Sequence, residues 1–97
     1  MPAITFEGAL CTGDGCFPPR SNNDGDSTFL VNGTPAHVEG NSWPVHSCGD
    51  NQHSGELASG SPTFLINGQE AGRIGDPLGG GCSAAVAEGD ETFLVDD

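Results

Sequence analysis

The octapeptide DSTFLVNG at residues 26–33 recurs as SPTFLING at residues 61–68 and as DETFLVDD at residues 90–97. A glycine precedes every copy, at Gly25, Gly60 and Gly89. The spacing between copies is uneven, but they match almost letter for letter. An internal repeat of this kind predicts a fold that is assembled from copies of one structural unit.

Each unit reads as a β-hairpin. The first two copies end in Asn-Gly, a dipeptide that tolerates positive φ and favours a tight turn. Return strands are expected after these turns, at residues 35–40 and 70–76. Residues 2–8 look like a third return strand, whose partner is the last copy. We therefore expect three hairpins around one pseudo-three-fold axis; three ordinary hairpins of a β-sandwich are the alternative.

Composition supports an all-β domain with little or no helix. The chain has 16 Gly and 7 Pro, and it shows no helical period of apolar residues. With 97 residues, of which 34% are hydrophobic, we expect a single small domain over residues 1–97. Such a small core needs help from a staple or a partner.

The centres of the repeated strands indicate a binding surface. A strand with one face in water alternates apolar and polar residues, and these strands do not. One apolar face can fill the core, while the leucine on the other face forms a symmetric exposed patch, which is typical of a partner interface. Alternatively, loops cover both faces of a thicker core. The candidate partner-binding residues are Phe29, Leu30, Val31, Phe64, Leu65, Ile66, Phe93, Leu94 and Val95.

The charge of the chain excludes some partners. Fourteen acidic residues against two basic ones give a net charge of −12. This charge repels phosphate, so we expect no nucleic-acid binding and no stable association with a membrane. The first residues lack a basic region and an apolar run, which predicts synthesis in the cytoplasm without a signal peptide. No stretch is long enough to span a membrane.

Thiols and imidazoles together suggest a metal. In a reducing compartment cysteines are more often free or metal-bound than paired, and a tetrahedral set of N and S donors suits Zn²⁺. We expect free buried thiols, with a disulfide between Cys11 and Cys16 as the alternative. The spacing alone carries little weight, because the chain has no Cys-x-x-Cys motif. The candidates are Cys11, Cys16, Cys48, Cys82, His37, His46 and His53.

The chain resembles the PAAR-repeat family, small conical proteins at the spike tips of contractile phage tails and type VI secretion systems. The resemblance covers nearly the whole chain and is carried by the Met-Pro start and by residues 11–20, 31–37, 43–48, 58–68 and 73–77. The sequence also departs from the family. Asp14 stands where the family usually has His, and the Pro-Ala-Ala-Arg signature is replaced by Glu70-Ala71-Gly72-Arg73.

The resemblance implies a structural zinc near the apex, held by three His and one Cys. The matching positions are His37, His46 and His53, with Cys82 as the sulfur ligand and Cys48 or Cys11 as rivals; iron is the alternative metal. A closed four-ligand site has no open position for substrate, so we expect no enzymatic activity.

The resemblance also implies a role. The chain would cap a trimeric β-helical spike, one copy per trimer, and sharpen it for piercing the target envelope during contractile injection, with only transient contact with that envelope. Its size, without an appended toxin domain, resembles a stand-alone phage member at the tip of the central spike of the virion baseplate. A small metal or redox protein is the alternative, and a zinc hydrolase with Glu39 or Glu56 as its base comes third.

Overall fold

The computed structural model describes residues 2–13, 15–79 and 83–95. This part of the chain is all β, as the composition predicts, and contains no helix, so none that is long and apolar enough to span a membrane. The strands are β1 (Ala3–Ile4), β2 (Asp26–Val31), β3 (Thr34–Ala36), β4 (Ser42–Cys48), β5 (Asn51–Glu56), β6 (Leu65–Ile66), β7 (Gln69–Glu70) and β8 (Asp90–Leu94).

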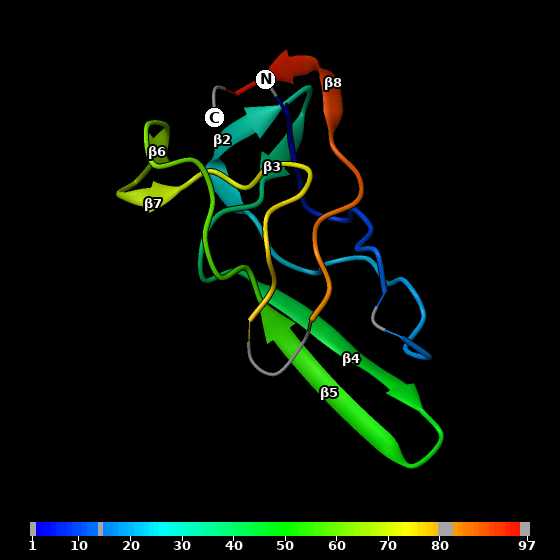
Figure 1. Cartoon of the computed structure of the whole chain (residues 1–97). Coiled ribbons are helices and arrows are strands. Elements are labelled where there is room, and N and C mark those ends of the chain that lie inside the picture. The colour runs from blue at the N-terminus through cyan, green and yellow to red at the C-terminus, as the bar shows by residue number, and fades with distance from the viewer. Residues whose placement is uncertain (1, 14, 80–82, 96–97) are drawn as a thin grey trace.

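The strands of the repeats form three antiparallel pairs. Strands β2 and β3 form one hairpin and β6 and β7 another, while β1 near the start of the chain pairs with β8 near its end. Strands β1 and β8 therefore lie together at the end of the molecule away from β4 and β5 (Figure 1). The turns of the first two hairpins hold Asn32 and Asn67 at φ values of 49° and 52°, the left-handed region in which Asn is tolerated. The arrangement agrees with three copies around a common axis.

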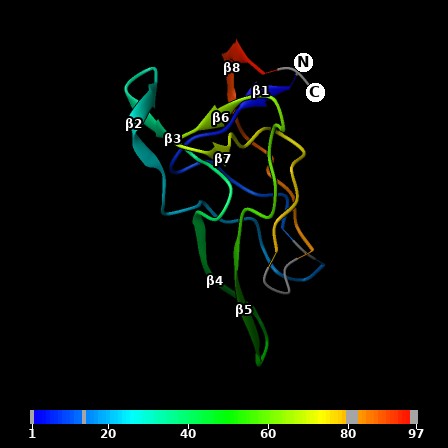
Figure 2. The same ribbon diagram turned by 90° about the vertical axis from the view of Figure 1, so that its left-hand side faces the viewer.

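A fourth hairpin, β4–β5, was not predicted. The sequence gives no strand signal here, because β4 contains Pro44 and β5 has no alternation of apolar and polar side chains. The pairing runs from Ser42 opposite Glu56 to Cys48 opposite Asn51, with an irregularity between Trp43 and His46. This tip hairpin projects from the body, as both views show (Figures 1 and 2). The molecule accordingly measures 38 × 22 × 22 Å.

The interior contains two hydrophobic clusters. One comes from the repeated hairpins, with partly buried Phe29, Phe64 and Phe93 packed against it. The other comes mostly from the segments between them and contains Trp43, the largest fully buried side chain. The first cluster consists of Ile4, Val31, Ala36, Val38, Ile66, Ala71 and Val95, and the second of Cys11, Trp43, Leu57, Leu78, Ala84 and Val86.

The glycine before each repeated strand is required by close packing. A Cβ on Gly60 would lie 2.3 Å from the carbonyl oxygen of Ala71, and one on Gly89 would lie 2.7 Å from that of Ile4. Gly25 lies against β3 in the same way. None of the three has positive φ. Each glycine therefore lets a strand start directly against the return strand of its own hairpin.

Candidate functional site

The first candidate site is the apolar surface of the repeated strands, here called the base surface. Leu30 and Leu65 are each 55% exposed, and Leu94 is 47% exposed. These leucines belong to β2, β6 and β8, which lie at the end of the molecule away from the tip hairpin (Figures 1 and 2). The exposure predicted for them is confirmed.

The aromatic residues beside these leucines hold the three strands together. The rings of Phe29, Phe64 and Phe93 contact one another, with centroids 5.6 to 5.8 Å apart. The Phe29 ring is edge-on to the other two rings, while Phe64 and Phe93 are tilted to each other, and aromatic pairs at this spacing are favourable contacts. The leucines are therefore presented by strands that share one aromatic centre.

The residue that follows each of these leucines is buried, so its predicted place on the partner-binding surface is wrong. Val31, Ile66 and Val95 were candidates for partner binding, but they are 3%, 4% and 2% exposed and belong to the core. The reason is the alternation of side chains along a strand, which turns the residue after an outward leucine inward. The base surface consists of the three leucines and the exposed parts of the phenylalanines.

Hydrogen bonds between neighbouring repeats fix the strands of the base surface relative to one another. Asn67 donates from Nδ2 to Asp26 Oδ2 at 2.8 Å and to Thr28 Oγ1 at 2.6 Å. The Asn of the first hairpin turn makes the same two contacts with the third repeat. The residues of this second link are Asn32, Asp90 and Thr92. The sequence analysis assigned the asparagines to turns only, and missed that they join neighbouring repeats.

The same hydrogen bonds keep an acidic rim charged. The pKa of Asp26 lies below its usual value, first because the Thr28 hydroxyl donates to the carboxylate and then because Asn67 does. The pKa of Asp90 is lowered by Thr92 and then by Asn32. Hydrogen bonds to the charged form of a carboxylate favour that form. Strands β2 and β8 therefore each start with a negative charge, whereas the second repeat has Ser61 at the matching position.

The second candidate site lies on the tip hairpin, where two of the predicted metal ligands meet. His46 on β4 is directly opposite His53 on β5. Their Nε2 atoms are 2.5 Å apart, and their ring centroids are 4.4 Å apart. The ring of Phe17 packs against both, with centroids 4.8 Å from His46 and 4.0 Å from His53. The two predicted ligands therefore face each other across the hairpin.

The cysteines beside this pair differ from the prediction. Cys16 is joined to Cys48 in a disulfide with the Cα atoms 5.6 Å apart, so neither is a free thiol, and Cys16 does not pair with Cys11. Cys11 is free and buried, as expected for that residue. The pairing follows from the fold, because the segment around Phe17 crosses the tip hairpin and brings Cys16 to the end of β4.

His37 belongs to different surroundings. It is fully buried, its Nδ1 hydrogen-bonds to the carbonyl oxygen of Asp24 at 2.7 Å, and its ring lies edge-on to Trp43 at 5.3 Å. Its Nε2 is buried without a hydrogen-bond partner in the described part of the chain. Burial lowers the pKa of His37, against a smaller opposite effect of the Asp24 carbonyl, so the ring is neutral at pH 7.

The predicted ligand set is therefore only partly assembled. His46 and His53 are together, no described contact joins them to His37, and Cys82 lies outside the described residues. With Cys16 and Cys48 bonded to each other, the described residues contain no group of three or more His, Cys, Asp or Glu side chains that could hold a metal. The zinc site with three His and Cys82 stays a prediction.

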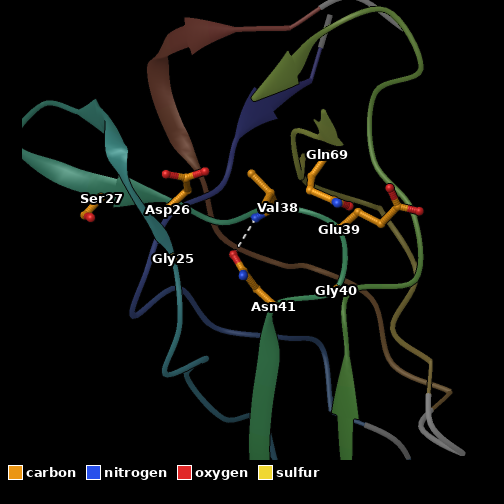
Figure 3. Close-up of a pocket in the computed structure, with 8 residues that line it drawn as sticks. All are labelled: Gly25, Asp26, Ser27, Val38, Glu39, Gly40, Asn41 and Gln69. Atoms are coloured by element: carbon orange, nitrogen blue, oxygen red, sulfur yellow. Dashed lines mark hydrogen bonds between the residues drawn. The ribbon is translucent and has the colours of Figure 1, made fainter. Parts of the chain in front are cut away.

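A third feature is a polar hollow of about 510 Å³ between the start of the first repeat, the segment that follows β3, and Gln69 of β7 (Figure 3). Its ionisable groups are Asp26 and Glu39, and its wall is fixed by a 2.8 Å hydrogen bond from the Val38 amide to Asn41. The lining offers no imidazole or thiol as a nucleophile. It consists of Gly25, Asp26, Ser27, Val38, Glu39, Gly40, Asn41 and Gln69.

Three antiparallel strand pairs with an exposed apolar base surface and a projecting tip define a small all-β domain. Comparison with known families then identifies it more closely: the chain belongs to the PAAR-motif family, whose model matches residues 12–86. Proteins of this family are structural; they sit on spike proteins at the tips of contractile injection systems. Comparison with curated proteins gives no match.

Proposed function

We propose that this chain caps the end of a trimeric β-helical spike and forms the point that pierces a target envelope during contractile injection. The observation that supports the proposal is the set of Leu30, Leu65 and Leu94, one on each repeated strand and each about half exposed. A chain with three repeated hairpins matches a three-fold partner with a single copy. The spike would cover the leucines and continue the strands.

The position of the tip hairpin supports the mechanical part of the proposal. It projects from the body away from the strands of the base surface (Figure 2). When the spike is driven forward, the force is concentrated on this narrow end. A disulfide and a contact between three aromatic rings stiffen it. We place the chain at the spike tip of a phage-type contractile tail, as the resemblance in size and motifs implies, and we propose a structural zinc in its apex.

The test uses the trimeric spike protein of the same contractile system. We expect the two proteins to form a complex with one copy of this chain per trimer, measured by size-exclusion chromatography with light scattering. Leu65→Asp is expected to abolish the complex, because it places a charge on the base surface. Val45→Asp is the matched control, since Val45 is an aliphatic residue with 59% exposure on the tip hairpin.

The proposal fails if Leu65→Asp and Val45→Asp bind the spike equally well. It also fails if the complex contains three copies per trimer, because the internal repeat would then have no symmetry to match. The free energy at stake can be estimated. Burying three half-exposed leucines contributes roughly 1 kcal/mol each. Together they account for about 3 kcal/mol, or on the order of a hundredfold in Kd.

A further inference from the structure

The exposed leucine of the first repeat shares its side of the strand with a carboxylate. On β2, Thr28 and Leu30 are exposed on either side of Phe29, which packs inward against the core. The Asp26 carboxylate is tied to the exposed side, because its Oδ1 accepts a hydrogen bond from the Thr28 hydroxyl at 2.6 Å. Two residues of a strand span about 7 Å. A lysine or arginine side chain on a partner that covers Leu30 can therefore reach this carboxylate.

The third repeat has the same arrangement, and the second repeat does not. On β8, Thr92 and Leu94 lie on either side of Phe93, and Asp90 Oδ1 accepts from the Thr92 hydroxyl at 2.5 Å. In the second repeat the matching residue is Ser61, whose buried hydroxyl accepts hydrogen bonds from two backbone amides of its own repeat. Of these three strand starts, two therefore present a carboxylate beside an exposed leucine.

Both carboxylates are held in place and still have room for one more donor. Asp26 accepts from the amide and the hydroxyl of Thr28 through Oδ1, and from Asn67 through Oδ2. Asp90 accepts the matching three hydrogen bonds from its own repeat and from the first hairpin turn. An ionised carboxylate offers about four acceptor positions. Because both residues are accessible to solvent, one position and the charge remain for a partner.

The cations for these carboxylates have to come from the partner. The chain has 14 acidic and only two basic side chains, and both basic ones are engaged within the molecule. Arg73 forms an ion pair with Asp76 at 2.9 Å, and Arg20 is buried with its guanidinium over the ring of Trp43. A partner that buries the leucines comes close to the two carboxylates, and burying a charge without a counter-charge is costly.

We propose that the end of the trimeric spike carries one lysine or arginine per protomer at the edge of its apolar contact surface, and that two of these three side chains pair with Asp26 and Asp90. This proposal rests on the capping role proposed above. The spike's third basic side chain faces the start of the second repeat and stays in solvent. The leucines supply the apolar contact, while the two ion pairs speed association and favour a spike with a basic rim over one with an acidic rim.

The experiment measures the Kd between the full chain and the trimeric spike protein of the same contractile system by titration calorimetry, at about 0.1 M and about 1 M sodium chloride, where the Debye length is about 10 Å and about 3 Å. An exposed ion pair changes Kd by up to about fivefold, so we expect wild type to bind roughly tenfold more weakly at the higher salt concentration. The double variant Asp26→Asn/Asp90→Asn should bind that weakly at both concentrations. Asp50→Asn is the matched control and should behave as wild type, because Asp50 is an exposed acidic residue between β4 and β5.

The unchanged protein decides the question even if the double variant does not fold, because its own binding is measured at both salt concentrations. Wild-type binding that is unchanged or tighter at high salt overturns the proposal, and so does a folded double variant that keeps the salt dependence of the control. A complex that Leu65→Asp abolishes but salt does not weaken refutes only the basic rim and leaves the capping role standing. The absence of any complex refutes both.

Discussion

Replacing the glycine before each repeated strand tests the fold directly, and Gly60→Ala is expected to have the largest effect on stability. The added Cβ would lie 2.3 Å from the Ala71 carbonyl oxygen and 2.7 Å from the carbonyl carbon. The backbone at Ala71, directly after β7, has to withdraw by about 0.7 Å before the first contact reaches 3.0 Å, below which real Cβ contacts are essentially absent. Because the obstacle is backbone, no side chain can rotate out of the way.

The cost has two parts. Overpacking of this kind typically costs about 1–3 kcal/mol. The carbonyl that must move also accepts a 2.8 Å hydrogen bond from the amide of Ser61, whose weakening costs about 1 kcal/mol. We therefore predict that Gly60→Ala lowers the free energy of unfolding by about 3 kcal/mol. For a domain of this size, that corresponds to a fall in Tm of roughly 12–24 °C.

The assay is thermal and denaturant unfolding followed by far-ultraviolet circular dichroism. Gly79→Ala is the control, because its Cβ would meet nothing closer than Ala58 Cβ at 3.5 Å and Gly79 has no positive φ. We expect the control to be neutral or stabilised by up to about 1 kcal/mol. Gly89→Ala should rank after Gly60→Ala, and Gly25→Ala should be mildest, because its closest obstacle is a side-chain atom at 2.9 Å. If Gly60→Ala melts at or above the control, the close packing of strand and return strand is refuted.

Two further predictions concern the second core cluster and its histidine. Trp43→Ala should lower the free energy of unfolding by about 3–5 kcal/mol in denaturant titrations, because it removes a fully buried side chain. Trp43→Phe should lower it clearly less, because the buried indole N–H that it removes has no hydrogen-bond partner in the described part of the chain. The pKa of His37 is lower in the fold than in the unfolded chain, so the unfolded chain binds the proton first as the pH falls. The free energy of unfolding should therefore decrease as the pH drops below about 6.5. The unfolding curves of His37→Gln should lack that part of the pH dependence.

The repeat carries enough information to predict most of the base. Its Asn-Gly turns predict the hairpins, and its non-alternating centre predicts the exposed leucines, because both follow from local rules of turn and strand. The glycine before each copy of the repeat is visible in the sequence, but the reason why glycine is needed there is not. Only the structure shows that each one lies against a carbonyl or side chain that is about ten or more residues away.

The tip could not be predicted in the same way. Strand β5 contains no apolar side chain and has Gly55 near its end, so no hydrophobic period marks it. Disulfide pairing depends on proximity in space, and Cys16 and Cys48 are 32 residues apart in sequence. The same holds for imidazoles: His46 and His53 meet because a hairpin turn lies halfway between them. The position of His37 depends on its packing against Trp43, which the sequence does not reveal.

The internal repeat and the disulfide of the tip hairpin can be explained together. A single chain can approach three-fold symmetry only where its sequence repeats, and the segments between the repeats differ in length and composition. The first of them forms the tip hairpin, which carries exposed Val45 and few buried apolar side chains beyond Trp43.

A two-stranded hairpin such as the tip hairpin is at best marginally stable alone. The Cys16–Cys48 bond, worth about 2–4 kcal/mol, ties its far end to a second segment, while Trp43 ties its near end to the core. Reducing that bond should therefore loosen the tip and leave the base surface intact, because no residue of the first core cluster belongs to the tip hairpin.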